Sequence, residues 1–398
     1  MICYAMPRYG GFVAATLGLW VAGCQAPPAH HYPIGLWGTG RVVDLPAVRA
    51  AGFNTVSGPA DMSYLNAAQA LGLKIMASPG VGLPGGTDVQ KAAARASQSD
   101  RHPALWSWFI TDEPDLWGRS PAEVRNMVRQ VREIGLGKPT CLTLFQGYEA
   151  IWYRGITDAV ILDRYPINWL PLANFGQHVR LARLGLGEKQ SLIATVQAFD
   201  WRFYPSMLPN ENPDKLRCPT YEEIRCMTYC ALAERANGLM YYCFDDGPGR
   251  WRMMEHTNTW NAVRAVVQEV NRRLPLFEAE HRWWAKGQRW REPQRRFNEA
   301  MESSITSAWL HVKEGGAGAP AGDYVLAVNN TDQKQEYSFT LPVPTGHRVP
   351  AFDEGRTVAV TEGWVTDVFE PYAIHIYGPI ERKAGTEKHG AGAPIGGV

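Results

Sequence analysis

The chain has 398 residues, of which 45% are hydrophobic and 20% are charged, and its formal net charge is +1. This is an ordinary globular composition with enough apolar surface for a large core. The near-zero net charge gives no electrostatic reason to expect nucleic acid or an anionic surface as a partner. The length suits one barrel of roughly 250 residues with a smaller second domain.

The first 24 residues resemble a bacterial lipoprotein signal peptide. Arg8 supplies a positive charge, and residues 11–22 form an apolar stretch too short to span a bilayer comfortably. Val21-Ala22-Gly23-Cys24 resembles the lipobox, in which the cysteine is lipid-modified, and residues 25–31 suit a tether. The sequence predicts an exported protein, anchored through Cys24 to a bacterial membrane in the periplasm or at the cell surface. A signal peptide cut without lipidation is the alternative.

From residue 32 to 280, short apolar runs alternate with helical patterns, which is typical of βα units. Eight strands are predicted, at 33–37, 54–57, 74–78, 105–111, 140–145, 159–163, 192–197 and 238–244. Gly52, Gly72 and Gly238 are expected to close helices in the left-handed conformation. Two capping boxes are predicted, Ser120 with Glu123 and Thr220 with Glu223. Eight strands with crossovers, and no Gly-rich nucleotide loop after the first, favour an α/β fold of the closed (β/α)8 TIM-barrel type.

The pattern changes after the last barrel helix, predicted at 259–274. Residues 281–303 are expected to connect the barrel to a second domain at 304–380, and the tail 381–398 is expected to be disordered. The second domain has short strands separated by turn residues, at 307–312, 324–329, 336–341, 358–361, 364–369 and 373–377. This spacing predicts a small antiparallel β-sandwich.

The fourth predicted strand runs directly into Asp112-Glu113-Pro114. Barrel enzymes carry their chemistry at the C-terminal ends of the strands, so two carboxylates are expected at the barrel mouth. The motif resembles the Asn-Glu-Pro at the end of strand four in the large clan of retaining barrel glycosidases. The resemblance implies that Glu113 is the catalytic acid/base. A helix cap within a loop is the structural alternative.

The resemblance breaks at the seventh strand, where that clan has a nucleophilic Glu and this chain has Gln197. An amide cannot form the glycosyl-enzyme ester. Asp163, at the end of the sixth strand, is the first choice for the second carboxylate, with a salt bridge to Arg164 or another Arg at the barrel mouth as its structural alternative. A separation of about 5 Å from Glu113 would indicate retention, and roughly 6.5–9.5 Å inversion. Acids after strands seven and eight, among them Asp200, Glu211, Asp245 and Asp246, are further candidates.

Adjacent acids at the end of strand four also occur in barrel hexosaminidases whose substrate supplies its own acetamido group as nucleophile. That resemblance implies that Asp112 orients the acetamide and Glu113 protonates the leaving oxygen, with Gln197 or Tyr165 holding the acetamide. The result would be a substrate-assisted 2-acetamido-hexosidase.

The chain has 15 Trp and 16 Tyr residues, more than a core of this size usually needs. Aromatic side chains near strand ends suit either sugar stacking or core packing. The candidate sugar contacts are Trp37, Trp117, Trp169, Trp201, Tyr204 and Trp251, with the polar groups of Tyr165, Gln197 and Asp246 beside them. Trp106 and Trp108 lie within strand four and are expected in the core.

No cofactor is expected, and the histidine and cysteine spacings suggest no metal site. Cys226 and Cys230 share one helix face and are expected to be buried thiols, while Cys218 is a candidate for one disulfide. No Gly-x-Ser-x-Gly motif supports an ester hydrolase.

These features together predict a glycoside hydrolase that cleaves O-glycosidic bonds of an extracellular oligo- or polysaccharide. Its partners would be the glycan and, through a lipid anchor only, a membrane. A non-catalytic glycan-binding lipoprotein is the alternative from another functional class, and Gln197 is the feature that supports it.

Overall fold

The computed structural model describes residues 31–80, 89–187, 189–208, 210–282, 304–341, 343 and 345–380. The chain divides into two units, residues 1–31 and 32–398, and the description below concerns the second. The predicted signal peptide with Cys24, the tether up to residue 30, the connecting segment from residue 283 and the predicted tail lie outside the described residues. Within the described ranges, no helix is both long and apolar enough to cross a membrane.

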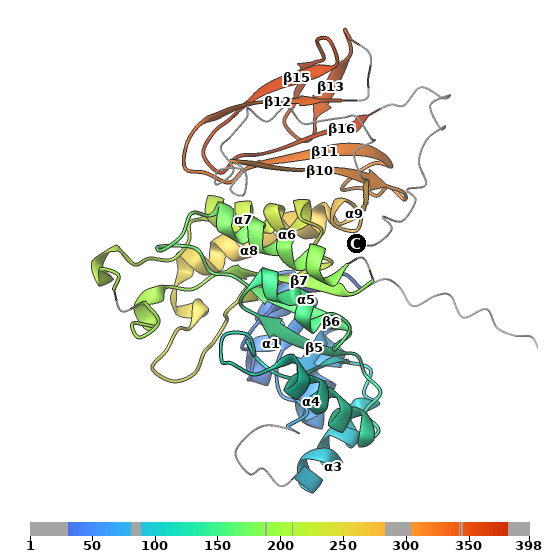
Figure 1. Ribbon diagram of the computed structural model, residues 1–398, viewed down its shortest axis with the longest axis vertical. Coiled ribbons are helices and arrows are strands. Elements are labelled where there is room, and N and C mark those ends of the chain that lie inside the picture. Colours follow the sequence, from blue (N-terminus) through green and yellow to red (C-terminus); the bar gives the residue numbers. More distant parts are fainter. Residues whose placement is uncertain are drawn as a thin grey trace, which may run out of the picture. The chain divides into compact units, whose positions relative to one another are not determined.

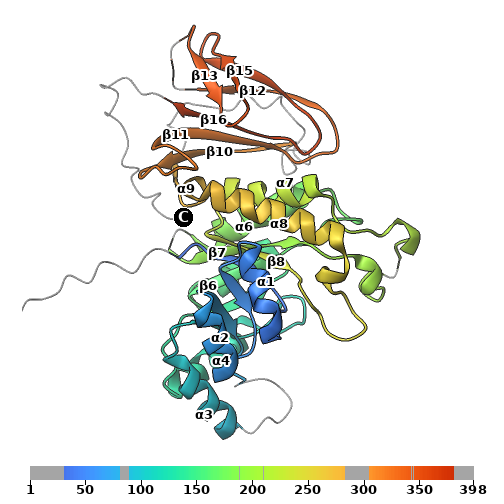
Figure 2. The same cartoon turned by 180° about the vertical axis from the view of Figure 1, so that it is seen from behind.

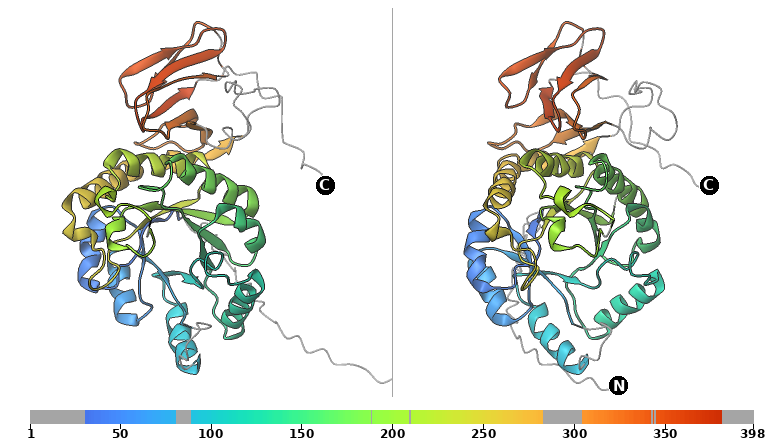
Figure 3. Two further views of the ribbon diagram at one scale, coloured as in Figure 1. Left: turned by 60° about the vertical axis from the view of Figure 1, so that its left-hand side comes forward. Right: turned by 90° about the vertical axis from the view of Figure 1, so that its left-hand side faces the viewer.

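Eight parallel strands close into a barrel in chain order, β1 to β8, and helices surround them (Figures 1–3). The predicted (β/α)8 barrel is confirmed. The strands are β1 (Ile34–Leu36), β2 (Thr55–Ser57), β3 (Lys74–Ala77), β4 (Leu105–Phe109), β5 (Thr140–Leu144), β6 (Ala159–Asp163), β7 (Ser191–Gln197) and β8 (Gly238–Tyr242). The helices are α1 (Leu45–Ala50), α2 (Met62–Ala70), α3 (Val89–Asp100), α4 (Pro121–Glu133), α5 (Ala150–Tyr153), α6 (Ala173–Leu186), α7 (Tyr221–Ala233) and α8 (Thr257–Arg272).

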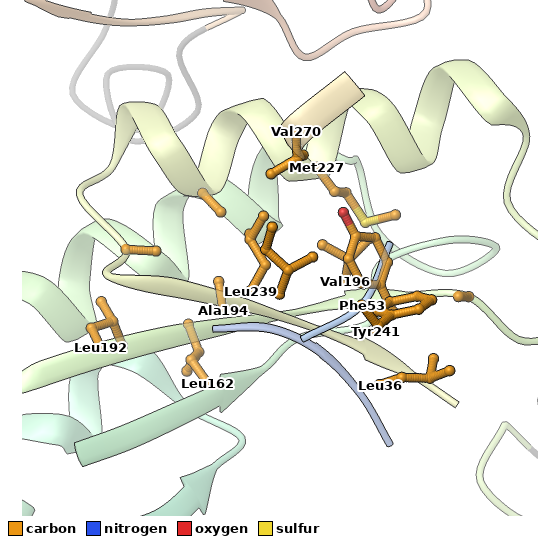
Figure 4. Packing of buried hydrophobic residues seen from close by; sticks show 14 of the residues in the cluster. Leu36, Phe53, Leu162, Leu192, Ala194, Val196, Met227, Leu239, Tyr241 and Val270 are labelled. Carbon is orange, nitrogen blue, oxygen red and sulfur yellow. The ribbon is translucent and has the colours of Figure 1, made fainter. Parts of the chain in front are cut away.

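Because successive side chains of a strand point to opposite sides, the barrel has two separate apolar regions. Side chains that face the helices, such as Val196 of β7 and Tyr241 of β8, belong to the main core, and they lie near Met227 of α7 and Val270 of α8 (Figure 4). Side chains that face the barrel axis form a second, smaller cluster of Met76, Cys141, Ala159, Ile161, Ile193 and Met240. Because strand side chains alternate, the inward positions beyond Ile193 on β7 are Thr195 and Gln197. The apolar cluster on the barrel axis is therefore followed by polar side chains toward the C-terminal ends of the strands.

Local signals identified several helix ends correctly. Both capping boxes are present, at Ser120 with Glu123 and at Thr220 with Glu223. Gly52 (φ 104°) and Gly72 (φ 69°) take positive φ values after their helices, as predicted. The prediction for Gly238 is wrong, because it is the first residue of β8 and Arg235 takes the left-handed conformation instead (φ 71°).

The C-terminal part is an antiparallel β-sandwich, as predicted. Helix α9 (Leu274–Phe277) leads to β9 (Glu280–Arg282), and the later strands are β10 (Ile305–Val312), β11 (Gly322–Asn329), β12 (Gln335–Thr340), β13 (Arg348–Ala351), β14 (Arg356–Ala359), β15 (Trp364–Phe369) and β16 (Ile374–Ile380). One sheet has the order β14-β13-β16-β11-β10-β9, and β12 pairs with β15. Phe339, Val365 and Tyr377 are buried in its core. Strands β9 and β13 were not predicted.

The sandwich contacts the barrel through α7. Strands β10 and β11 pack against this helix, and the buried Cys226 thiol donates to the Asn329 carbonyl oxygen at 3.4 Å. Cys226 and Cys230 are buried as predicted, whereas the disulfide considered for Cys218 is not formed. All five described cysteines are free thiols.

Candidate active site

Glu113 has an unusual backbone conformation shortly after the end of the fourth strand. Strand β4 ends at Phe109, and Glu113 has a φ of 36°, a left-handed value that is rare outside glycine. Its carbonyl oxygen accepts hydrogen bonds from the N–H groups of Leu116 (3.0 Å) and Trp117 (3.1 Å). A tight turn therefore sets the direction of the Glu113 side chain.

This turn is also tied to the neighbouring strand. The Asp115 carboxylate accepts hydrogen bonds from the N–H groups of Phe145 (3.1 Å) and Gln146 (2.7 Å), which follow β5. No sequence pattern points to this role of Asp115. Two backbone donors on one carboxylate hold the acid-bearing turn to the rim of the barrel.

The Glu113 carboxyl is half-buried and titrates near neutrality. Burial, with a further contribution from the negative charge of Asp112, raises the pKa of Glu113 to about 7. The neighbouring side chains of Asp163 and Trp117 act in the opposite direction, because a donor close to the carboxylate favours its ionised form. Asp112 itself is exposed at the rim, although burial of its carboxyl group by surrounding protein atoms raises its pKa.

Asp163 is brought to Glu113, as its position at the end of β6 suggested. It is buried, and burial together with the negative charge of Glu113 raises the Asp163 pKa well above its usual range. The Tyr165 hydroxyl lies 3.4 Å from Oδ2, and Oδ1 has no hydrogen bond of ordinary geometry among the described residues. These surroundings keep Asp163 protonated, so that it donates to Glu113.

The alternative of a salt bridge between Asp163 and Arg164 is wrong. The Arg164 guanidinium lies over the rings of Phe145 (4.6 Å) and Trp169 (5.0 Å), and its Nε donates to Asn174 Oδ1 at 2.7 Å. Trp169, a predicted sugar contact, therefore has one face occupied by Arg164. Arg164 therefore interacts with Phe145, Trp169 and Asn174 and forms no ion pair with Asp163.

Gln197 lies at the position where the resemblance would place a nucleophile. It is buried, and its Oε1 accepts a hydrogen bond from the Ile167 N–H at 3.0 Å. Its Nε2 and the hydroxyl of Thr195, two positions earlier on β7, have no hydrogen-bond partner among the described residues. Unpartnered buried polar atoms are costly, so two of them at neighbouring inward positions are an unusual feature of this end of β7.

Several predicted aromatic side chains form one cluster at the ends of β6, β7 and β8. Phe199, which was not predicted, contacts Tyr165, Trp201 and Tyr204 with ring centroids 5.1, 4.7 and 5.0 Å apart. Tyr242 of β8 also lies 5.5 Å from Tyr165. Alternation along β8, with Met240 inward, could have identified Tyr242. The cluster makes an apolar wall beside the polar layer.

The remaining predicted contacts lie in different surroundings. Trp37 packs edge-on against Phe109 with ring centroids 5.3 Å apart, and both rings pack against the apolar cluster on the barrel axis. Trp117 is 67% exposed. Asp246 lies at the rim, where Arg250 pairs with it at 3.3 Å and the Tyr242 hydroxyl donates to it at 3.2 Å.

Trp251 requires a correction. It is completely buried and stacks on His256 with centroids 4.1 Å apart, and its Nε1 donates to the Cys243 carbonyl oxygen at 2.9 Å. A ring without exposed surface cannot cover a sugar. Trp251 is a packing residue of the segment after β8.

Two other candidate acids are already engaged. Asp200 is buried and pairs with Arg202 at 2.6 Å, and Asp245 pairs with Arg252 at 3.0 Å. In the described part of the chain, no group of three or more His, Cys, Asp or Glu is arranged to hold a metal ion. The structure thus gathers the carboxyl groups of Asp112, Glu113, Asp115 and Asp163 at the end of β4, and Asp115 is held by two backbone N–H groups.

No protein-family profile and no curated protein matches the chain. It is similar to the solved structure of an Anoxybacillus α-amylase, with 10% identity over 84% of this chain and 88% of that one and a TM-score of 0.51. An α-amylase from Geobacillus thermoleovorans, complexed with acarbose, gives 9% identity, 84% and 90% coverage and a TM-score of 0.51. Amy13B from Eubacterium rectale gives 7% identity, 87% and 95% coverage and a TM-score of 0.50. At these identities the similarity establishes the fold, a (β/α)8 barrel.

Proposed function

We propose that this protein is a glycoside hydrolase that acts on an oligo- or polysaccharide, with Glu113 as its general acid. The observation that carries the proposal is a half-buried carboxyl group with a pKa of about 7 at the end of β4. Such a group holds its proton at neutral pH and is strong enough to release it to a glycosidic oxygen. Near the same strand ends lie the buried, unpartnered polar atoms of Thr195 and Gln197 and the aromatic cluster around Phe199, and sugar-binding sites combine these two kinds of group.

Asp163 acts through Glu113 in this proposal and is a positioning residue. Retaining enzymes separate their two carboxyl groups by about 5 Å and inverting enzymes by roughly 6.5–9.5 Å, so that a sugar carbon or a water fits between them. Asp163 instead lies within hydrogen-bonding reach of Glu113. Because it is also protonated, it is a poor nucleophile and a poor base. Its hydrogen bond fixes the direction of the Glu113 carboxyl.

A second candidate mechanism follows from the lack of a carboxylate at Gln197. In a 2-acetamido sugar, the carbonyl oxygen of the acetamide attacks the anomeric carbon while the bond to the leaving oxygen breaks and Glu113 protonates that oxygen. Water then opens the resulting cyclic ion. The unpartnered Nε2 of Gln197 would donate to the acetamide, and the exposed Asp112 would accept its N–H.

The test is hydrolysis of a panel of 4-nitrophenyl glycosides and oligosaccharides by the wild type and the Glu113→Gln variant. Glu133→Gln is the matched control, because Glu133 is an exposed acid on α4 outside the site. We expect Glu113→Gln to lose activity by about 10²- to 10⁴-fold and the control to lose none. Activity confined to 2-acetamido sugars would support the substrate-assisted mechanism, and cleavage of plain hexosides would rule it out.

Binding without hydrolysis by the wild type would instead support the non-catalytic glycan-binding lipoprotein. If the wild type neither binds nor cleaves any glycan in the panel, the proposal fails.

We also propose that the mature protein is exported and lipid-anchored through Cys24, on the basis of the lipobox-like Val21-Ala22-Gly23-Cys24. Expression in a bacterial host with radiolabelled palmitate tests it. The wild type should carry label and enter the membrane fraction, and Cys24→Ala should do neither. Label on the alanine variant would exclude Cys24 as the modified residue.

A further inference from the structure

A cavity of about 400 Å³ opens at the barrel mouth, beside the ends of β1, β2 and β8. Its volume lies within the range of small-molecule sites. Four of the residues that line it are glycines, Gly38, Gly40, Gly58 and Gly247, so a ligand can approach the backbone closely. Glu113 follows β4 at the same end of the barrel, where barrel enzymes have their active sites.

The cavity lies near the proposed acid without including it. The ring of Trp37, the residue before Gly38, packs against Phe109 at the end of β4 with centroids 5.3 Å apart. Strand β3 separates β2 from β4, and neighbouring strands lie about 4.8 Å apart, so the ends of β2 and β4 are about 10 Å apart. One sugar ring does not span this distance, whereas two linked rings do. A sugar in the cavity would therefore be the second from the bond at Glu113.

Asp245 supplies hydrogen-bond acceptors at the cavity. Its Oδ1 accepts a hydrogen bond from the Gly247 N–H at 2.9 Å, and its Oδ2 accepts one from Arg252 Nε at 3.0 Å. An ionised carboxylate has about four acceptor positions, so each oxygen of Asp245 can accept one more hydrogen bond. The charge of Asp245 is already balanced by Arg252, which leaves the carboxylate suited to a neutral donor such as a hydroxyl group.

Arg41 and Ser57 supply hydrogen-bond donors at the same cavity. Arg41 forms an ion pair with Asp44 at 3.3 Å, but its guanidinium donates no hydrogen bond of ordinary geometry within the described ranges. Ser57 Oγ accepts a hydrogen bond from the Gly38 N–H at 2.8 Å, and its own proton has no acceptor in the part of the chain that the structure describes. Donors beside acceptors suit hydroxyl groups, which donate and accept at once.

We propose that this cavity binds an uncharged sugar residue, the second from the bond that Glu113 cleaves. The inference rests on the proposed function. It deepens that function by defining the substrate as a neutral oligo- or polysaccharide, because a glycoside of one sugar does not reach the cavity. The contacts of a remote sugar can lower the barrier at the cleaved bond, so a longer substrate should have a higher kcat/KM.

Gly40 offers a way to fill the cavity without straining the fold. A Cβ atom on Gly40 would meet no other atom within 4 Å, and its φ is not positive. Gly40→Leu therefore places a side chain in open space at the wall of the cavity. Gly137→Leu is the matched control, because its φ is not positive either and its Cβ would meet only Asp100 Oδ2, at 3.5 Å. Gly137 precedes β5, at the opposite end of the barrel.

A second pair of variants tests the donor. Arg41→Met removes the guanidinium and keeps most of the length of the side chain. Arg129→Met is its control, because Arg129 is a similarly exposed arginine, ion-paired with Glu133 at 3.6 Å on α4. Thermal unfolding of each variant verifies that the fold is retained, and Arg41→Met carries the test if Gly40→Leu does not fold.

The measurement is kcat/KM on the best-cleaved 4-nitrophenyl monoglycoside of the panel and on neutral oligosaccharides of the same sugar, from the disaccharide to the hexasaccharide. The wild type should gain in kcat/KM with chain length. Gly40→Leu should lower the ratio of the oligosaccharide value to the monoglycoside value by about 10- to 100-fold. Arg41→Met should lower this ratio by a smaller factor, and both control variants should keep it.

Two results would overturn the inference while the proposed function stands. One is a ratio in the folded Gly40→Leu and Arg41→Met variants equal to that of the wild type. The other is a wild type that prefers oligosaccharides of uronic acids to neutral ones. A wild type that cleaves neither the monoglycosides nor the oligosaccharides overturns both proposals.

Discussion

The carboxyl groups of Asp163 and Glu113 lie within hydrogen-bonding reach of each other, and among the described residues neither forms an ion pair with a cation. Two buried acids in contact cannot both ionise near neutrality, because their negative charges repel and burial penalises each one. Their protons are therefore released in two coupled steps. The more buried Asp163 retains its proton, which leaves Glu113 as the group that ionises first.

Glu113→Gln should stabilise the protein at alkaline pH. The folded-state pKa of about 7 lies above the ordinary value of 4.5, so the ionised carboxyl disfavours the folded state. The folded state therefore loses stability as pH rises from about 4.5 to 7. The variant should exceed the wild type in free energy of unfolding by about 1–3 kcal/mol at pH 8, with no difference at pH 4, after allowance for partial exposure. Urea unfolding at both pH values measures this, and a pH-independent difference would contradict it.

Variants of Asp163 should show whether it acts as a hydrogen-bond donor to Glu113 or as a nucleophile. Asp163→Asn keeps a hydrogen-bond donor toward Glu113, so the alkaline limb of the activity profile should stay near that of the wild type. Asp163→Leu removes the donor, which should raise the pKa of Glu113 and move the limb to higher pH. Adding azide to Asp163→Gly checks the assignment, since recovery of activity with formation of a glycosyl azide would identify Asp163 as the nucleophile.

Gln197→Leu should destabilise the fold by about 1–3 kcal/mol, because the buried Ile167 N–H loses its acceptor. Gln130→Leu on the exposed face of α4 is the control and should change stability by less than about 0.5 kcal/mol. Urea unfolding measures both. Equal stability of the two variants would show that the Ile167 N–H finds another acceptor.

Trp251→Ala should cost about 3–5 kcal/mol, since the ring is fully buried and stacked on His256. Trp117→Ala should change the free energy of unfolding by less than about 0.5 kcal/mol, because Trp117 is on the surface. Chemical unfolding of the two variants side by side measures this contrast. Similar costs for both would mean that the indole of Trp117 packs more tightly than its exposure indicates.

The barrel was predictable because its signals are local. Each apolar run is short and periodic, and the capping boxes at Ser120 and Thr220 depend on residues three positions apart. The short strands β9 and β13 escaped prediction because they have three and four residues and are defined by pairing with distant strands. Arg235 replaced Gly238 as the left-handed residue because β8 begins directly at Gly238.

The site was predictable in position and less so in chemistry. The ends of β4 and β6 gave Glu113 and Asp163 directly, since parallel strands end at one rim. Their contact depends on the turn after β4 and on burial, neither of which has a sequence pattern. For the same reason Trp251 was misassigned, because the segment after β8 folds its indole inward onto His256.

The left-handed backbone of Glu113 implies a trade-off between catalytic activity and the conformational energy of the backbone. At φ 36° a side chain carries a steric cost of the order of 1 kcal/mol that glycine avoids. A glycine there would relax the chain and remove the acid in the same step. The residue that the proposed chemistry requires is therefore one that the local geometry disfavours, and inactive sequences with glycine at this turn should be the more stable ones.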